Sequence, residues 1–374
     1  MKKYNGIRKY IAILPTISLV NSYAMQIALN NKDTKYINLN FLRGLQKNDN
    51  ELQEHVIESI VQHPNVGGAL LVTNDLQSSI NYKKKYKTYS KLINSISLLG
   101  SSGNKDFLSI SKNIINNIKL EIKDLKINKI NLKKICVALE CGGSDQTSGI
   151  FNNPVIGMLV DYLIAQGSTV IISETAEFIG TEKIIKSSTK NISVSNKIIK
   201  AIKQKDNFMK KSGIDYRGIN PTQENLKEGI TTLVEKSLGA IKKAGGCNFS
   251  EYIDYASKPT KKGLIFMDTP FYTPVSFTGM MSAGSCINLL GMGSFNPSNN
   301  PIVPTLRICS NPHTIKKWNN IIDVDLSVYF KKANVDLAFN KLKEIFFETL
   351  NGRDTLSEKE NSGEILIPYK SELL

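Results

Sequence analysis

The chain has 374 residues, of which 41% are apolar, and it carries a formal net charge of +15 at pH 7. This length suggests two domains or one large one, and the apolar share is sufficient for a proper hydrophobic core. No run of eighteen apolar residues occurs, so we expect no membrane span.

Cysteine usage and the first residues bear on the compartment. The five cysteines, at positions 136, 141, 247, 286 and 309, show no paired spacing, which indicates reduced thiols rather than a disulfide framework. The apolar run from Tyr10 to Val20 is interrupted by Pro15 and lacks a small-residue cleavage site. We therefore expect a cytoplasmic protein.

The positive charge is mostly lysine, spread over residues 83–85, 118–134 and 183–211. Such an excess is compatible with nucleic-acid binding. No arginine–aromatic pattern accompanies it, however, so a solvated basic surface is the favoured interpretation, and we do not expect nucleic acid as a partner. A positive field would still speed the association of a small anionic substrate.

The first 132 residues alternate between short apolar runs and helical patterns. Strands are predicted at 10–15, 36–39 and 69–73, and helices at about 18–29 and 51–61. Residues 80–131 are basic and helical in pattern, with apolar side chains at Leu92, Ile93, Ile96, Leu98 and Leu99. We expect a small α/β domain over residues 1–132, and a second domain over residues 133–374.

The second domain begins with a strand–helix–strand pattern. Residues 135–139 and 168–172 are apolar and partly β-branched, which is typical of buried strands. The helix predicted between them spans 154–165, with Asn153 as its N-cap, Pro154 in its first turn and Gly167 at its end. This βαβ unit predicts a parallel sheet with a right-handed crossover.

Polar residues follow both strands of this unit, at the carboxyl edge where open α/β sheets bind ligands. Cys141, Ser144, Asp145, Thr147 and Ser148 follow the first strand, and Glu174 and Glu177 follow the second. Two glutamates and one aspartate there are suited to a divalent cation or to acid–base chemistry. The alternative is a plain turn followed by helix-start charges. The dinucleotide fingerprint is absent.

The rest of the chain continues the α/β pattern. Helices are predicted at 178–208, at 233–244 and from 276 to 282, and strands at 263–267, 287–291 and 305–309. The segment beyond Glu358 is polar, and we expect it to be loose.

Several separated motifs resemble the altronate/galactarate dehydratase family, which also includes the large subunit of sulfolactate sulfo-lyase. They are ECGGSDQTSG at 140–149, ISETAE at 172–177, GITTLVEKSLG at 229–239, GLIFMDTP at 263–270, VSFTG at 275–279 and DVDLS at 323–327. Two N-terminal stretches also match, GIRKYIAILPT at 6–16 and HPNVG at 63–67. The resemblance therefore covers nearly the whole chain.

The resemblance implies a lyase with a small dimerising α/β domain followed by a Rossmann-like domain. In the family reaction a proton α to a carboxylate is removed, and water, or sulfite in the sulfo-lyase, departs from the β-carbon. A divalent metal, associated with iron in the family, would hold the substrate and stabilise the enediolate. A homodimer and a separate small partner subunit are also implied, because this chain lacks the extra N-terminal domain of some members.

Motif positions assign roles by resemblance. The catalytic candidates are Asp145, Glu174, Glu177 and Asp268, and the first three are also the metal candidates. The substrate-binding candidates are Cys141, Gly142, Gly143, Ser144, Thr147, Ser148, Thr231, Thr232, Lys236 and Thr269.

Departures from the family pattern concentrate in the first domain. Three family cysteines align with Leu19, Leu45 and Leu76, a histidine aligns with Phe41, and a glutamate aligns with Gln77. Leucine cannot bind a metal, so an iron centre that used these thiolates would be lost as a unit. We expect the three leucines to approach one another or to line a shared apolar pocket. The segment Gly291–Ser294 also lacks the arginine that would clamp a carboxylate.

Three hypotheses follow from these residues. The first is an active hydro-lyase that acts on a small hydroxy acid or sugar acid. The second is an altered or inactive paralogue that binds a partner subunit or a small anion, or a sulfo-lyase large subunit. The third is a basic protein that binds nucleic acid.

The charge distribution gives a testable prediction. If the lysines only solvate the surface, binding to duplex DNA should be weak at low salt and should vanish near physiological salt, because it depends on counterion release. Fluorescence anisotropy of a labelled duplex across a salt series measures this. Sub-micromolar binding at physiological salt would instead support the third hypothesis.

Overall fold

The computed structural model describes residues 3–4, 6–127, 129–213 and 220–370. The chain forms two compact units. The first comprises residues 1–130, 300–303 and 361–374, and the second comprises residues 131–299 and 304–360. Each unit contains a parallel sheet with helices, which confirms the predicted α/β class. No helix among the described residues is long and apolar enough to cross a membrane.

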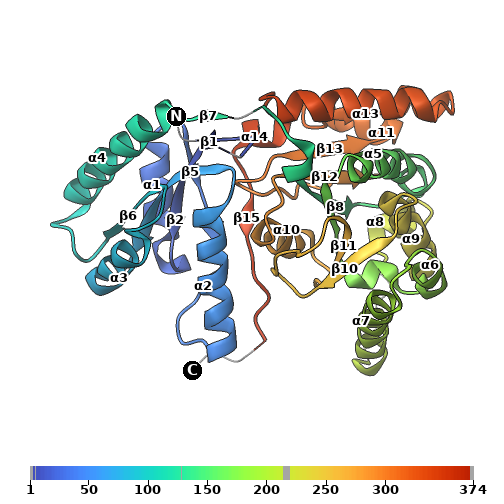
Figure 1. Ribbon diagram of the computed structural model, residues 1–374, viewed down its shortest axis with the longest axis horizontal. Coiled ribbons are helices and arrows are strands. Elements are labelled where there is room, and N and C mark those ends of the chain that lie inside the picture. The colour runs from blue at the N-terminus through green and yellow to red at the C-terminus, as the bar shows by residue number, and fades with distance from the viewer. Residues whose placement is uncertain (1–2, 5, 128, 214–219, 371–374) are drawn as a thin grey trace. The chain divides into compact units, whose positions relative to one another are not determined.

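The first unit is built on a four-stranded parallel sheet with the order β3-β2-β5-β6 (Figure 1). Its strands are β2 (Tyr10–Pro15), β3 (Thr34–Tyr36), β5 (Val66–Thr73) and β6 (Leu92–Ser97). Its helices are η1 (Ser18–Val20), α1 (Asn21–Leu29), α2 (Lys47–Gln62), α3 (Leu76–Tyr86) and α4 (Asn104–Lys123). Two short pairs complete it, β1 (Lys3–Tyr4) with β7 (Lys126–Ile127), and β4 (Asn38–Leu39) with β15 (Glu364–Ile365).

The core of this unit lies between the strands and the helices α1 and α4. Ile13, Leu70 and Val72 from the sheet pack with Phe107 and Ile115 of α4. The helical prediction for residues 92–97 is wrong, because this segment is β6 and pairs with β5 from Gly68 to Thr73. Tertiary pairing with a wholly buried strand decides the conformation of such a short apolar run, which local periodicity leaves ambiguous.

The C-terminal segment is also better ordered than the sequence indicates. Glu364 and Ile365 pair in parallel with Asn38 and Leu39, and Ile365 and Ile367 are buried. The expectation of a loose segment beyond Glu358 is therefore wrong for the residues described up to 370. Two isoleucines at alternate positions place enough apolar surface on one side of the strand to dock it.

The three leucines that the resemblance aligns with family cysteines are not part of the buried core, and their approach to one another stays a prediction. Leu19 and Leu76 expose 63% and 56% of their surface, and Leu45 is half-buried. Leu19 follows β2 and Leu76 follows β5, so both lie beyond the carboxyl ends of neighbouring strands. Phe41, which the resemblance aligns with a family histidine, is fully buried in this unit.

The second unit contains a seven-stranded parallel sheet with the order β10-β11-β9-β8-β12-β13-β14 (Figure 1). The strands are β8 (Cys136–Gly142), β9 (Thr169–Ile172), β10 (Phe249–Ile253), β11 (Gly263–Met267), β12 (Ile287–Met292), β13 (Thr305–Cys309) and β14 (Val324–Asp325). The predicted βαβ unit is confirmed, since β8 and β9 pair in parallel with Val137 opposite Val170. The strands β10 and β14 were not predicted.

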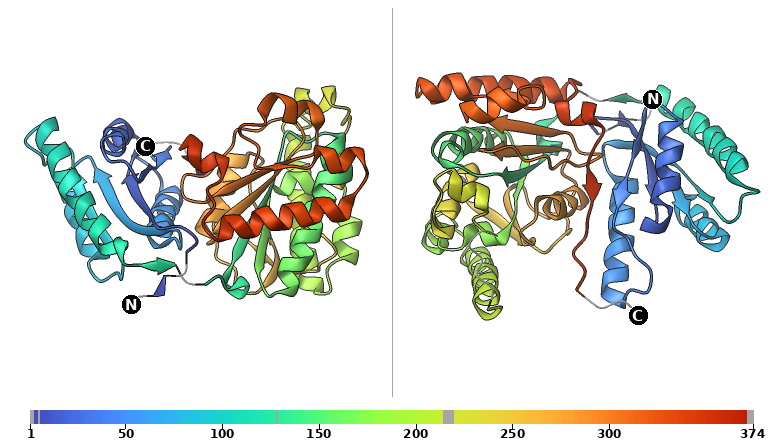
Figure 2. Two further views of the ribbon diagram at one scale, coloured as in Figure 1. Left: turned by 90° about the horizontal axis from the view of Figure 1, so that it is seen from above. Right: turned by 180° about the vertical axis from the view of Figure 1, so that it is seen from behind.

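Helices surround this sheet. They are η2 (Leu132–Lys134), η3 (Ser148–Asn152), α5 (Asn153–Ala165), η4 (Thr175–Phe178), α6 (Glu182–Ser187), α7 (Ile192–Lys211), α8 (Gln223–Lys227), α9 (Leu233–Ala240), η5 (Ile241–Ala244), α10 (Thr273–Ser282), α11 (Pro312–Trp318), α12 (Ser327–Lys331), α13 (Val335–Leu350) and α14 (Leu356–Glu360). Figure 2 shows the long α13 running beside α5. The core on the α10 side joins Phe277 and Met280 to Ala138, Ile171 and Leu290 of the sheet.

Strand order determines where a ligand site can form. From the first strand of this sheet, β8, the chain proceeds to β9 on one side and later to β12 on the other. The carboxyl ends of β8 and β12 therefore lie at a topological switch point, where open α/β sheets form their ligand crevices. The motif that begins at Glu140 occupies this position.

Candidate functional site

The carboxyl ends of three adjacent strands bring a set of buried polar side chains together. Glu140 lies near the end of β8, Glu174 follows β9, and Thr269 follows β11. Ala138 belongs to the core on the α10 side, so Glu140, two residues later in the same strand, projects toward α10 as well. The short helix η4 adds Glu177, and α9 and η5 add Lys236 and Lys243.

Glu140 is completely buried and hydrogen-bonded through both carboxyl oxygens. Its Oε2 accepts from Ser276 Oγ at 2.5 Å and from Ser173 Oγ at 2.9 Å, and its Oε1 accepts from the Cys141 amide at 3.1 Å. Burial raises the pKa of Glu140 to about 7, although the Lys243 ammonium opposes the shift. Glu140 therefore changes its protonation near neutral pH.

Glu177 is the ionised member of the set. Its Oε1 lies 3.0 Å from Lys236 Nζ and its Oε2 lies 3.7 Å from Lys243 Nζ, and all three side chains are buried. Burial favours the neutral acid, but the two ammonium groups outweigh it and hold the pKa of Glu177 below its usual range. The same partnership, with Cys141 and Glu140, keeps the pKa of Lys243 above its usual value despite burial.

Glu174 is held in a strained backbone conformation beside this pair. Its φ of 62° and ψ of 69° lie in the left-handed region, which costs a non-glycine residue of order 1–3 kcal/mol. Its amide donates to Thr269 Oγ1 at 2.8 Å, which fixes the turn. Burial, together with the charges of Glu140 and Glu177, raises the pKa of Glu174 well above its usual range, and its carboxyl is hydrogen-bonded to Glu177.

Glu140, Glu174 and Glu177, called here the glutamate cluster, are the group that could hold a metal among the residues the structure describes. Their nearest carboxylate oxygens all lie within 4.8 Å of one another. This arrangement of carboxylates does not fit a divalent cation. Both carboxyl oxygens of Glu177 already pair with lysine ammonium groups, and Oε2 of Glu140 already accepts from two serine hydroxyls. A cation at the same place would face the positive charges of both lysines.

Cys141 lies next to the cluster and is surrounded by donors. Its Sγ accepts from Ser144 Oγ at 3.4 Å and from Asn153 Nδ2 at 4.0 Å, and it is hydrogen-bonded to Lys243. The thiol is buried, but Ser144 and Asn153 line a neighbouring pocket. Cys141 is therefore hydrogen-bonded both to residues that line this pocket and to Lys243.

The pocket, called here the α9 pocket, has a volume of about 410 Å³. It is lined by residues of the 144–153 loop and of α9, among them Ser144, Asp145, Ser148, Asn153, Lys236 and Lys242. Lys236 belongs to the pocket wall and also pairs with Glu177 of the glutamate cluster. One buried polar atom of a lining residue, Asn153 Oδ1, has no hydrogen-bond partner among the described residues.

Two of the predicted acids lie outside the glutamate cluster. Asp145 caps its own turn, accepting from Ser148 N at 2.7 Å and from Thr147 Oγ1 at 2.9 Å, and it also accepts from Asn311 Nδ2 at 2.7 Å. Asp268 accepts from Thr175 Oγ1 at 2.6 Å and from Tyr252 OH at 3.3 Å. The turn interpretation therefore describes Asp145 well, whereas Glu174 and Glu177 do meet.

The other predicted binding residues fall into three groups. Cys141, Ser144, Ser148, Lys236 and Thr269 lie at the cluster or the pocket. Thr231 and Thr232 are exposed and cap α9 with Glu235. Gly142 and Gly143 allow close packing instead, since a Cβ on Gly143, whose φ is 56°, would lie 2.3 Å from Ser294 Oγ.

Four residues in or beside the glutamate cluster were not predicted as site residues, namely Glu140, Ser173, Lys243 and Ser276. One signal was available for Glu140, because a carboxylate that ends a buried apolar strand needs partners inside the protein. Lys243 had no local signal, since it follows Lys242 in a helical segment and only the fold distinguishes the buried lysine from the exposed one. Ser173 and Ser276 had no local signal either, because serine is common at strand ends and in the first turns of helices.

Comparisons with known proteins agree with the motif positions. The C-terminal model of D-galactarate/altronate dehydratases matches residues 132–372, and the model of the second domain of D-galactarate dehydratase/altronate hydrolase matches residues 2–106. The beta subunit of (2R)-sulfolactate sulfo-lyase from Chromohalobacter salexigens is 27% identical over 357 residues, which cover 94% of this chain and 91% of that protein.

Two dehydratases are similar at comparable identity. Altronate dehydratase from Bacillus subtilis is 26% identical over 378 residues, which cover 98% of this chain and 75% of that protein. Galactarate dehydratase (L-threo-forming) from Escherichia coli is 28% identical over 214 residues, which cover 55% of this chain and 41% of that protein. All of these relatives are named as lyases, in agreement with the prediction of a lyase.

The buried ion pairs predict that two neighbouring lysines differ in how much they contribute to the free energy of unfolding. Lys243→Met leaves Glu177 and Cys141 without one of their cationic partners, and losing one partner of a buried pair costs roughly 3–5 kcal/mol. Lys242→Met, one residue earlier and exposed, should change the free energy of unfolding by less than about 0.5 kcal/mol. Urea unfolding of both variants checks this, and equal effects would contradict the buried pairing.

The raised pKa of Glu140 predicts a pH dependence of stability. Because its pKa rises from 4.5 to about 7 on folding, the folded chain binds more protons than the unfolded chain between these values. Stability should therefore fall as pH rises from about 4.5 to about 7. In Glu140→Gln this contribution to the slope should disappear, which unfolding at a series of pH values measures. An unchanged slope would show that Glu140 is ionised throughout this range.

Proposed function

Because the chain belongs to the D-galactarate/altronate dehydratase family, we propose that it is a hydro-lyase that removes water from a small hydroxy acid or sugar acid. The observation that carries this proposal is the buried Glu174–Glu177 pair with Lys236, next to a pocket that Lys236 itself lines. Elimination of water needs a base for the α-proton, an acid for the departing hydroxyl, and positive charge beside the substrate carboxylate.

The environments of the two carboxyl groups support an assignment of acid and base. Two carboxyls whose pKa values are pushed apart supply one proton acceptor and one proton donor at the same pH. Glu177, held ionised by its lysines, is the acceptor in this proposal, and Glu174, held protonated by burial and like charges, is the donor. The strained backbone of Glu174 is the kind of feature found at reacting groups.

Lys236 is the group that stabilises charge. Its Nζ bonds Glu177 Oε1 at 3.0 Å and Asn220 Oδ1 at 2.9 Å, and it lies 4.5 Å from the centre of the Phe271 ring. An ammonium fixed in this way can stabilise the negative charge that develops on the substrate carboxylate as the α-proton leaves. Asn153 Oδ1, a pocket atom without a hydrogen-bond partner among the described residues, is then available to a hydroxyl group of the substrate.

A second candidate is a sulfo-lyase that works with a separate small subunit. It is favoured by the length match with the sulfolactate sulfo-lyase beta subunit, which spans more than nine-tenths of both chains. The missing arginine in Gly291–Ser294 also weakens the case for an ordinary sugar-acid site. In this second candidate the leaving group is sulfite. Glu177 again accepts the α-proton, and the ammonium group of Lys236 again stabilises the substrate carboxylate. A homodimer, alone or with the small subunit, is part of both proposals.

An activity panel tests these proposals. We expect purified protein to dehydrate at least one acid among altronate, galactarate and gluconate, or to release sulfite from sulfolactate, and to retain this activity after treatment with a chelator. Glu174→Gln and Lys236→Met should each lower kcat by about 10²–10⁴-fold. Glu228→Gln is the matched control, because it changes an exposed carboxylate that directly follows α8. It should leave kcat within about twofold.

The panel is run anaerobically with and without ferrous iron, and with and without a co-expressed small subunit. No turnover of any acid under all four conditions would favour the non-catalytic paralogue. Strict dependence on iron would overturn the metal-free assignment of the glutamate cluster. Turnover that Glu174→Gln leaves unchanged would remove Glu174 from the proposed chemistry.

A further inference from the structure

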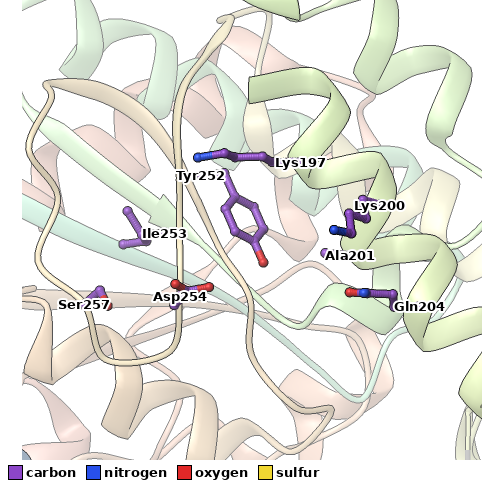
Figure 3. Close-up of a pocket in the computed structure, with 8 residues that line it drawn as sticks. All are labelled: Lys197, Lys200, Ala201, Gln204, Tyr252, Ile253, Asp254 and Ser257. Carbon is purple, nitrogen blue, oxygen red and sulfur yellow. The ribbon is translucent and has the colours of Figure 1, made fainter. Parts of the chain in front are cut away.

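A second pocket lies between α7 and the edge strand β10, on residues that the proposed reaction does not use. Its volume is about 440 Å³. Lys197, Lys200 and Gln204 line it from α7, and Tyr252, Asp254 and Ser257 line it from β10 and the loop that follows (Figure 3). It shares no lining residue with the α9 pocket. We call it the α7–β10 pocket.

Helical spacing places the basic side of this pocket on one face of α7. Lys197, Lys200 and Gln204 are three and four residues apart, so their side chains project in one direction. Val194, Ile198 and Ile202 hold the helix against the rest of the unit by their burial. Neither lysine forms an ion pair with any residue in the described part of the chain, so two unpaired ammonium groups line the α7 side of the pocket.

The opposite side of the pocket carries groups that can form hydrogen bonds with the hydroxyl groups of a ligand. Asp254 is exposed and presents a carboxylate that accepts from hydroxyls, and Ser257 can donate or accept. Tyr252 directs its ring into the pocket and donates its own hydroxyl to Asp268 at 3.3 Å. The two sides therefore suit different ends of one molecule, an anionic group at α7 and a hydroxyl group at Asp254 and Ser257.

We propose that the α7–β10 pocket binds a small hydroxylated anion, a phosphate- or carboxylate-bearing polyol, as an effector that acts on the Glu174 loop. The anionic group of the effector lies between Lys197 and Lys200, and a hydroxyl group bonds Asp254. This site is distinct from the proposed reaction site, and its existence does not depend on the proposed activity.

A short chain of hydrogen bonds connects the pocket to the glutamate cluster. Tyr252 OH and Thr175 Oγ1 both donate to Asp268, at 3.3 Å and 2.6 Å, on its two carboxyl oxygens. Thr175 directly follows Glu174, whose backbone is strained. An effector that packs against the Tyr252 ring restrains the Tyr252–Asp268–Thr175 chain and so stabilises the strained turn at Glu174.

Binding is measured by isothermal titration with glycerol 3-phosphate, with glycerate and with inorganic phosphate. We expect the full-length chain to bind glycerol 3-phosphate or glycerate more tightly than inorganic phosphate, because only the first two carry hydroxyl groups for Asp254. Comparing the dissociation constants of glycerol 3-phosphate and glycerate shows whether the site prefers a phosphate or a carboxylate. The double variant Lys197→Ala/Lys200→Ala should weaken this binding at least about tenfold, since two charge-assisted contacts are lost.

Matched variants separate this site from general charge effects. Lys203→Ala/Lys211→Ala removes two exposed lysines from the same helix but not from the pocket, and it should keep the dissociation constant within about twofold. Unchanged binding in Lys197→Ala/Lys200→Ala, equal losses in both double variants, or no binding of the three probes at millimolar concentration would each overturn the site.

Coupling to the Glu174 loop is measured by hydrogen–deuterium exchange of residues 173–178. The effector should slow exchange there in the natural chain. Tyr252→Phe, which loses the hydrogen bond to Asp268 but keeps the ring, should bind the effector with a dissociation constant within about threefold and lose the protection. Full protection in Tyr252→Phe would overturn the coupling, and this readout does not require the proposed activity.

Discussion

Five charged or ionisable side chains share one buried space in the second unit, and their mutual compensation shapes the rest of the site. An isolated carboxylate or ammonium is expensive to bury, and it remains ionised only beside an opposite charge and hydrogen bonds. Glu177 is compensated by two ammonium groups, Glu140 by two hydroxyls and an amide, and Glu174 by taking a proton. Each residue depends on the others for its protonation state.

This compensation requires a rigid frame. The sheet supplies it, because β8, β9 and β11 are adjacent and parallel, so their carboxyl ends deliver Glu140, Glu174 and Thr269 to one edge. The π-helical turn η3 at the start of α5 is a feature that often marks functional sites. Asn153 follows η3 directly and lies between Cys141 and the α9 pocket. The strain at Glu174 persists because hydrogen bonds on both sides of it fix the turn.

The cluster and the departures from the family pattern lie in different units. Every side chain of the cluster comes from the second unit, whereas Leu19, Leu45 and Leu76, which the resemblance aligns with family cysteines, lie in the first. The compensation of charges in the cluster therefore uses none of these three positions. Leu19 and Leu76 are exposed after two strand ends, so neither belongs to the apolar core.

The sequence by itself determined the elements whose signal is local. The apolar runs around Val137 and Val170, with the capped helix between them, required a parallel βαβ unit, and the loops after its strands had to meet at one edge. Glu174 and Glu177 were predictable for that reason. Motif order also determined the family, because many residues in fixed sequence carry that information without any structure.

Only the tertiary structure decided which charges are buried together. Lys242 and Lys243 are chemically identical neighbours, yet one faces solvent and the other reaches Glu177, because rotation by one residue along a helix changes the face. Asp145 and Glu140 are both acidic residues at the same strand end, but the turn supplies Asp145 with its own donors and α10 supplies Glu140 with Ser276. Similarly, the pairing of residues 92–97 with β5 overrode a helical pattern. Contacts between residues more than a hundred positions apart, such as Glu140 with Ser276, have no signature in local sequence.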